Sequence, residues 1–171
     1  MVHIYCGDGK GKTTASVGLA IRMAGTGGKV VYAQFMKGND SGEHKSLAQF
    51  SNITLLKNEK NLGFTFQMNE EQRRELTDMH NGKLAEIQKI LEDGKCDLLV
   101  MDELTYPYRD HHLNRQLVDQ IITQYGKKIE ICITGRSPDE RLVEKADYMT
   151  EMKMIKHPFT SGVGARKGVE F

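Results

Sequence analysis

The sequence predicts an α/β fold in which helices cover a mainly parallel central sheet. Short apolar runs typical of strands alternate along the chain with longer segments whose apolar residues recur at helical spacing. Strands separated by helices in this way tend to pair in parallel, because each helix returns the chain to the start of the next strand. The length of 171 residues and the hydrophobic content of 39% suit a single domain, residues 1–171.

The first half of the chain supplies three of the expected strands and two of the expected helices. The strands are Val2–Cys6, Lys29–Gln34 and, more weakly, Ile53–Leu56. The helices are Thr13–Ala24, which glycines end, and Asn69–Glu92, with Asn69 as N-cap and Gln72 placed for a capping box. Polar, glycine-containing loops of the kind that often carry specificity are expected at 35–50 and 57–68.

The second half continues the alternation. Leu98–Met101 is wholly apolar, as expected of a central parallel strand that is covered on both faces. Further strands are expected at Ile129–Thr134 and Tyr148–Ile155. The intervening helices are predicted at Leu113–Tyr125 and at Pro138–Lys145, the latter with Ser137 as its cap.

Composition argues against several classes of function. The formal net charge of +1 provides no global field that would attract nucleic acid. Cys6, Cys96 and Cys132 are far apart and form no C-x-x-C pair, which argues against a zinc ribbon and a disulfide framework. No apolar stretch is long enough to span a membrane, and no signal peptide is evident, so a cytoplasmic location is expected.

The segment GDGKGKTT, Gly7–Thr14, joins the first strand to the first helix and is typical of a phosphate-binding loop. Gly7, Gly9 and Gly11 allow the backbone to turn so that N–H groups face an anion, and the following helix adds the positive end of its dipole. The usual spacing G-x-x-x-x-G-K-[ST] would place a glycine where Cys6 stands. The loop is therefore one residue shorter than the common form.

Side chains in and beyond this loop suit a nucleotide with a metal ion. Lys12 offers a positive charge to phosphate oxygens, and Thr13 offers a hydroxyl to Mg²⁺; Lys10 is either a second phosphate contact or solvated. Asp102 and Glu103 end the apolar strand and resemble a Walker B element, whose carboxylates hold Mg²⁺ directly or through water.

Two further motifs differ in what they indicate. Arg136, at the end of the next predicted strand, is placed on the same rim and suits triphosphate oxygens, with a solvated turn as the alternative. The neighbouring His111 and His112 point apart on most backbones, so a solvated loop is favoured there over a metal site.

These motifs together predict a P-loop NTPase-like, RecA-like three-layer fold that uses ATP or GTP with Mg²⁺. A GTPase is disfavoured because no N-K-x-D segment is present, and a thymidine kinase because the expected zinc cysteines are absent. The charge balance disfavours a DNA motor. A P-loop ATPase or nucleotide kinase of RecA-like build, and a nucleotide-binding regulator without turnover, remain as alternatives.

The chain resembles the P-loop class of ATP:corrinoid adenosyltransferases over most of its length. The resemblance rests on segments at 7–14 (GDGKGKTT), 34–38 (QFMKG), 42–43 (GE), 63–66 (GFTF), 101–104 (MDEL), 133–136 (ITGR), 146–152 (AD followed by TEM) and 156–171. It implies that an adenosyl group passes from ATP to the Co(I) of a reduced corrinoid and that inorganic triphosphate leaves. It also implies that ATP lies reversed along the loop relative to the hydrolases.

The resemblance implies roles for particular residues. The implied triphosphate site comprises Gly7, Asp8, Gly9, Lys10, Gly11, Lys12, Thr13, Thr14 and Arg136. Mg²⁺, with Mn²⁺ as an alternative ion, is expected at Thr13 and Glu103, with Asp102 assisting. Lys12 is expected to be catalytic because it neutralises the charge of the leaving group.

The resemblance places Phe64 and Phe66 against the lower face of the corrin, where they displace the lower ligand and make Co(II) easier to reduce. Packing of these rings into the core is the alternative. Many relatives carry tryptophan at the second position, and this chain has none, so the seal is expected to be looser.

Partners are likewise implied by the family rather than by the residues. A homodimer is expected, as is an electron donor, either a reduced flavin or a flavodoxin-like protein; no partner membrane or nucleic acid is expected. Family members often carry an N-terminal extension that covers the active site. Here the first strand begins at Val2, so the lid is expected to be missing or supplied elsewhere.

Overall fold

The computed structural model describes residues 1–36, 41–58, 60 and 65–170, with Phe66 described by its backbone alone. These residues contain a six-stranded sheet in the order β3-β2-β4-β5-β1-β6. Every pair of neighbouring strands is parallel. The strands are β1 Val2–Cys6, β2 Val30–Gln34, β3 Ile53–Leu56, β4 Leu98–Asp102, β5 Glu130–Thr134 and β6 Tyr148–Glu151.

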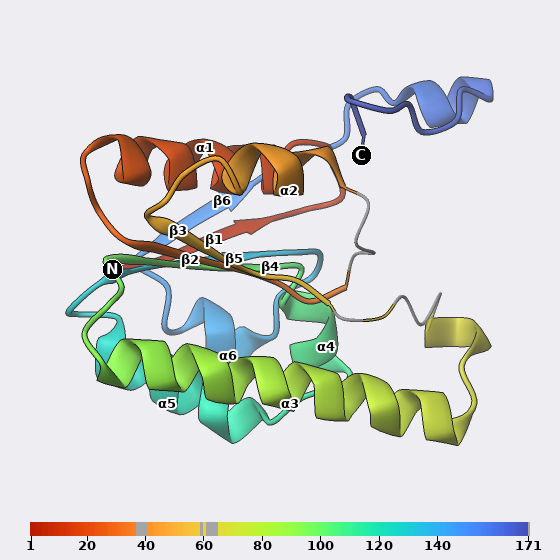
Figure 1. Ribbon diagram of the computed structural model, residues 1–171. Helices are drawn as coiled ribbons and strands as arrows, with labels where there is room; N and C mark the ends of the chain where they lie inside the picture. The colour runs from red at the N-terminus through yellow and green to blue at the C-terminus, as the bar shows by residue number, and fades with distance from the viewer. Residues whose placement is uncertain (37–40, 59, 61–64, 171) are drawn as a thin grey trace.

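Helices lie on both faces of the sheet, which confirms the predicted three-layer α/β fold (Figure 1). One face carries α1 Lys12–Gly25 and α2 Gly42–Leu47. The other carries α3 Glu70–Glu92, α4 Thr105–Arg109, α5 Arg115–Tyr125 and α6 Glu140–Val143. Within the described ranges, no helix combines the length and apolar character needed to cross a membrane.

The central strand β4 is buried along its whole length because it supplies both halves of the core. Leu99 packs into the cluster that includes Leu84 of α3, whereas Val100 packs into the cluster that includes Ala20 of α1. Successive side chains of a strand point to opposite faces, so a strand covered on both sides must be apolar at every position. This explains why the run at Leu98–Met101 lacks the alternation of a half-exposed strand.

Helix α3 begins as the sequence predicts. The Asn69 side chain accepts a hydrogen bond from the Gln72 amide (2.9 Å), and the Gln72 side chain accepts one from the Asn69 amide (3.0 Å). This reciprocal capping box satisfies two donors that the first turn would otherwise leave unpaired. The final strand, in contrast, ends at Glu151 and is shorter than predicted.

The predicted start of α6 is wrong by two residues. Ser137 does not cap the helix: it has φ 46°, and α6 begins at Glu140 with Asp139 as N-cap. The Asp139 carboxylate accepts from the Arg141 amide (3.0 Å) and from Arg115 of α5 (2.8 Å). A carboxylate at this position accepts a first-turn amide as a serine hydroxyl would, and its charge also interacts favourably with the helix dipole.

Two short helices lie in parts of the chain for which no helix was predicted. Helix α2 falls inside the span 35–50 that is predicted to be a loop, and α4 follows β4 directly. After β6, residues 152–170 extend away from the sheet beyond α1 and contain a 3-10 turn at Pro158–Ser161 (Figure 1). Both short helices border the carboxyl edge of the sheet, where the site is built.

Candidate nucleotide site

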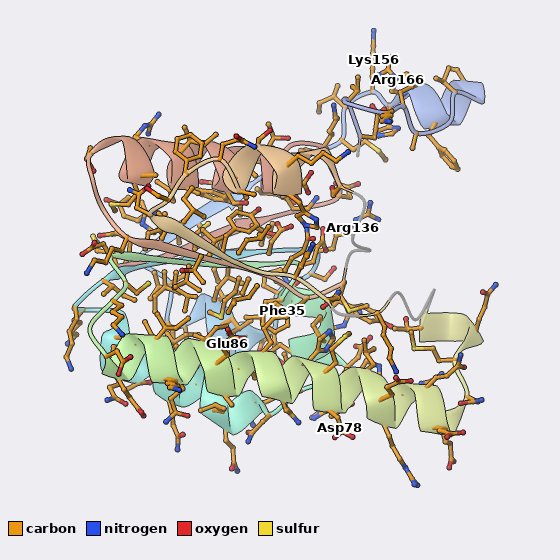
Figure 2. All side chains as sticks on the ribbon, viewed as in Figure 1. Phe35, Asp78, Glu86, Arg136, Lys156 and Arg166 are labelled. Atoms are coloured by element: carbon orange, nitrogen blue, oxygen red, sulfur yellow. The ribbon has the colours of Figure 1, made fainter. Side chains whose placement is uncertain are left out.

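The carboxyl ends of three adjacent strands bring the predicted nucleotide residues together. Strands β4, β5 and β1 are neighbours in the sheet, and their ends carry, in that order, Asp102 with Glu103, Arg136 and the phosphate loop. Ligands of open parallel sheets bind at this edge, because the loops there leave the strands in the same direction. Figure 2 shows Arg136 at this edge of the sheet.

The backbone of the phosphate loop is packed against the end of β6. The Gly9 amide donates to the Met152 carbonyl oxygen (2.7 Å). A Cβ atom at Gly7 or Gly9 would lie 2.5 Å from that same oxygen, so neither position accepts a larger residue. Gly11, with φ 115°, forms the N-cap of α1. The glycines are therefore required by close backbone approach and by left-handed geometry.

Lys12 lies folded over this loop. Its Nζ donates to the Gly9 carbonyl oxygen (2.8 Å), and the residue is only 7% exposed. Burial lowers the pKa of Lys12, and the nearby Arg136 guanidinium lowers it further, while the Glu103 carboxylate opposes the shift. A cation removed from water in this way gains more from an incoming anion than a solvated lysine does.

Asp102 is fully buried and links four elements of the site. Its carboxylate accepts from the Thr13 hydroxyl (3.1 and 3.3 Å), the Thr134 hydroxyl (2.6 Å) and the Gln34 side-chain amide (3.2 Å). These donors come from α1, β5 and β2 respectively. The Glu103 amide donates to Thr134 (3.0 Å), which fixes the residue that follows. Asp102 is thus held in one orientation from several sides.

The donor set at this point suits Mg²⁺. Thr13 and Asp102 are in contact, and Glu103 follows with φ 58°, a left-handed conformation that is strained for a residue with a side chain. Mg²⁺ prefers oxygen ligands and binds through one or two carboxylates together with substrate phosphates. Among the residues that the structure describes, no group of three His, Cys, Asp or Glu side chains could hold a metal ion.

Asp8 and Lys10 connect the loop to the C-terminal segment. Lys10 Nζ lies 3.8 Å from the Glu170 carboxylate, and its side chain is 48% exposed. Asp8 accepts from the Met154 amide at 3.4 Å. Lys10 therefore has an ionic partner within the chain, whereas the sequence offered only phosphate or water as its partner.

A cavity of about 440 Å³ adjoins the phosphate loop on the side of α1 and α2. Its volume falls within the range of small-molecule sites. It is lined by Thr13, Thr14, Val17, Ile21, Gly42, Glu43, Ser46, Gly168, Val169 and Glu170. The walls combine apolar side chains from α1 with two carboxylates, and the cavity opens beside the two threonines that follow Lys12.

The predicted corrinoid residues fall largely outside the described chain. Phe64 and the side chain of Phe66 lie outside it, while the backbone at Thr65–Gln67 forms a 3-10 turn. The Thr65 and Tyr106 hydroxyls are 2.7 Å apart, which ties this turn to α4. The expected role of the phenylalanines is therefore carried forward as a prediction.

Sequence reasoning missed Gln34 and Thr134 as parts of the Asp102 network. Both stood within quoted motifs, QFMKG and ITGR, but were given no role. The available signal was their position, since each is the last residue of its strand and shares the carboxyl edge with Asp102. A polar residue that ends a buried strand beside an acidic one is a candidate partner.

Comparison with known proteins decides the family. The model of the ATP:corrinoid adenosyltransferases BtuR/CobO/CobP matches residues 1–171, the whole chain. The chain belongs to this family. The resemblance inferred from the sequence motifs is therefore confirmed, and with it the predicted class of enzyme.

Several curated members of the adenosyltransferase family align with the chain over nearly its full length. The corrinoid adenosyltransferase of Escherichia coli (strain K12) is 30% identical over 171 residues, covering 100% of this chain and 85% of that protein. The Pseudomonas aeruginosa enzyme is 32% identical over 169 residues, covering 98% and 82%. Corrinoid adenosyltransferase CobA of Salmonella typhimurium is 30% identical over 177 residues.

Solved structures support the fold of this adenosyltransferase-family chain. A KaiC-like protein from Pyrococcus horikoshii superposes with a TM-score of 0.59 at 14% identity, covering 91% of this chain and 73% of that one. The flagellar accessory protein FlaH from Methanocaldococcus jannaschii gives 0.58 at 11% identity, covering 88% and 69%. At such identities the likeness concerns the fold alone, and it agrees with the P-loop NTPase-like architecture.

Proposed function

We propose that the protein transfers the 5′-deoxyadenosyl group of ATP to the Co(I) of a corrinoid and releases inorganic triphosphate. The observation that carries the proposal is the match to the adenosyltransferase family over the whole chain. A buried lysine in the phosphate loop, beside Thr13 and Asp102, supports it because these groups suit a polyphosphate. The corrinoid accepted is a cobalamin, a cobinamide or a cobyrinate diamide.

The reaction forms one bond and breaks one. The electron pair of Co(I) attacks C5′ of ATP, the cobalt–carbon bond forms, and the C5′–O bond breaks with its electrons going to triphosphate. The nucleophile belongs to the corrinoid, so no nucleophilic side chain is needed. The task of the protein is to hold C5′ near cobalt and to stabilise the negative charge of the departing triphosphate.

Residues of the phosphate loop perform this stabilisation. We assign Lys12, Arg136 and the loop from Gly7 to Thr14 to the triphosphate. Mg²⁺, or Mn²⁺ in its place, would be held by Thr13 and Glu103 and would supply further positive charge to the triphosphate oxygens. Asp102, fixed by three donors, keeps the Thr13 hydroxyl in place.

We further propose that the nucleoside occupies the cavity beside Thr14. Its apolar walls from α1 suit an adenine ring, and the Glu43 and Glu170 carboxylates that line it can accept hydrogen bonds from ribose hydroxyls. Phe64 and Phe66 are assigned to the lower face of the corrin, as the family resemblance implies.

The remaining proposals concern partners and location. We propose a homodimer in the cytoplasm, formed by one domain per chain, with an electron donor such as a reduced flavin or a flavodoxin-like protein. Tyr148 and Met149 on the edge strand β6 are each 51% exposed, which supports contact with a second copy.

The products of the reaction test the proposal. Protein, ATP, Mg²⁺ and chemically reduced cobalamin are mixed, and the light-sensitive alkylcobalt spectrum and the phosphate product are followed. Inorganic triphosphate without ADP is expected. ADP with an unchanged cobalt spectrum would overturn the proposal in favour of an ATPase or kinase, and tight ATP binding without any product would indicate a regulator.

A further inference from the structure

A line of buried hydrogen bonds leads from the nucleotide site into the segment between β3 and α3. The Gln34 side chain donates to Asp102 (3.2 Å), and the Gln34 carbonyl oxygen accepts from the Lys83 amine. Lys83 Nζ also donates to the Asn58 side-chain oxygen (2.6 Å). Gln34, Lys83 and Asn58 are all buried. One lysine of α3 therefore connects the end of β2 with the chain just after β3.

Packing alone does not account for a lysine at this position. Leu84 and Ile87, its neighbours on the buried face of α3, contact the sheet through apolar side chains. Lys83 is 6% exposed and lies with its amine 5.2 Å from the centre of the Phe35 ring, which Figure 2 labels. Burying an ammonium group is costly unless it is hydrogen-bonded. Here the amine donates hydrogen bonds to the Gln34 carbonyl oxygen and to the Asn58 side-chain oxygen, which belong to two separate segments.

Asn58 completes the connection to β2. Its side-chain amide donates to the Phe35 carbonyl oxygen (2.8 Å). A ring nitrogen of His80, one turn before Lys83 on α3, lies 2.8 Å from that same oxygen. The residue that opens the segment is thus joined to the end of β2 both directly and through α3.

The two anchored segments depend on Lys83 to different degrees. Strand β2 is paired with β3 on one side and β4 on the other, so Gln34 is held by the sheet whether or not the lysine is present. Asn58 lies beyond the last residue of β3, Leu56, and outside the sheet. Removal of the amine should therefore weaken the hold on Asn58, which keeps its own hydrogen bond to the Phe35 carbonyl oxygen, and leave Gln34 in place.

We propose that Lys83 is a positioning residue that holds the chain just after β3, at Asn58, against the end of β2 beside the nucleotide site. Loss of its amine changes how the corrinoid is bound and leaves ATP binding intact. The inference rests on the proposed function in one respect only, namely that Phe64 and Phe66, which follow Asn58 in the sequence, contact the corrinoid. The anchoring of Asn58 by Lys83 can be measured without any catalytic assay.

The kinetic test compares Lys83→Met with Lys89→Met, a matched change at an exposed lysine on the same helix. Lys83→Met is expected to raise the KM for the corrinoid by about tenfold, the order of effect of one lost buried hydrogen bond, and to leave the KM for ATP within about twofold. Lys89→Met should alter neither constant. Equal changes in both KM values, or no change in either, would overturn the proposal.

A second measurement separates anchoring from activity. Lys57 and Lys60 flank Asn58, so limited digestion with trypsin reports how firmly this part of the chain is held. Lys83→Met should accelerate cleavage at these two sites relative to Lys127 and Lys128, and Asn58→Ala should reproduce the effect while keeping the lysine. Unchanged cleavage in both variants would refute the anchor. Wild-type protein that makes no adenosylcorrinoid would refute the proposed function instead, whatever the digestion shows.

Discussion

The phosphate loop and the described ends of the segment 57–68 are held in place by different means. The phosphate loop is held by contacts of its main chain. The Gly9 amide donates a hydrogen bond to the Met152 carbonyl oxygen, and the space at Gly7 and Gly9 is too small for any side chain. The described ends of the segment 57–68 are held by side chains, Asn58 by Lys83 and Thr65 by Tyr106. Substitutions in distant helices should therefore disturb the second region far more than the first.

The largest effect is expected from the charge at the phosphate loop. Lys12→Ala removes the buried cation that stabilises the departing triphosphate and should lower kcat/KM by about a thousandfold, as loss of a transition-state donor does elsewhere. Lys10→Ala removes a second assigned charge from the same loop and should cost less, because Lys10 is half exposed and paired with Glu170. Triphosphate release measures both variants. Similar losses in the two would show that the loop acts through its overall charge rather than through Lys12.

The metal assignment predicts the next largest effect. Asp102→Asn disturbs the side chain that orients Thr13 and should raise the Mg²⁺ concentration for half-maximal activity by about 10- to 100-fold. Glu103→Gln, which alters a proposed ligand directly, should raise it further. Magnesium titrations of the two variants test this order. An unaltered magnesium requirement in Glu103→Gln would place the ion elsewhere.

On the corrinoid side, Phe66→Ala is expected to impair one half of the reaction. Without the ring, the lower face of the corrin is less well desolvated, so reduction from Co(II) should fall by about tenfold, while alkylation of pre-formed Co(I) changes little. Phe66→Trp is the matched variant with a larger ring, and it should favour the reduction of Co(II). Parallel assays that start from Co(II) and from Co(I) separate the steps, and equal losses in Phe66→Ala would mean that the ring is structural.

The smallest effect concerns pH. Burial lowers the pKa of Lys12 in the free protein, whereas bound triphosphate favours the charged amine. ATP should therefore bind with its highest affinity at pH values below the lowered pKa of Lys12. The affinity should fall as the pH rises through that pKa, by at most about tenfold per pH unit. Calorimetric titration across alkaline pH measures this slope. The same slope in Lys12→Ala would assign it to another group.

The sequence predicted best the features that are encoded by consecutive residues and are long enough to show a pattern. Apolar runs mark the strands, and GDGKGKTT marks the phosphate loop because its function depends on consecutive backbone groups. Helix α2 escaped prediction because six residues with only His44 and Leu47 buried are too few to show a period. Helix α4 contains Pro107, which usually argues against a helix but is tolerated in a first turn, where its missing N–H would be unpaired.

The contacts of Lys83 join residues that are far apart along the chain, and the sequence alone did not predict them. Lys83 lies on a helix with one other lysine, the exposed Lys89, and the local pattern does not distinguish a buried amine from an exposed one. Its partners Gln34 and Asn58 are 49 and 25 residues away. Only the packing of α3 on the sheet brings them together. The Asp102 network is different, because Gln34 and Thr134 are the last residues of neighbouring strands and the sequence carried that signal.

The contact between Gly9 and Met152 also bears on how strongly salt should weaken ATP binding. The Gly9 amide of this short loop already donates to a protein carbonyl oxygen and does not face the ligand. The negative charge of the triphosphate must therefore be balanced more by charged groups and less by the dipoles of backbone amides. Attraction between full charges is screened by electrolyte, whereas short hydrogen bonds to amides are affected far less. The affinity of this loop for ATP should accordingly depend on ionic strength more steeply than that of a phosphate loop with all its amides turned toward the ligand.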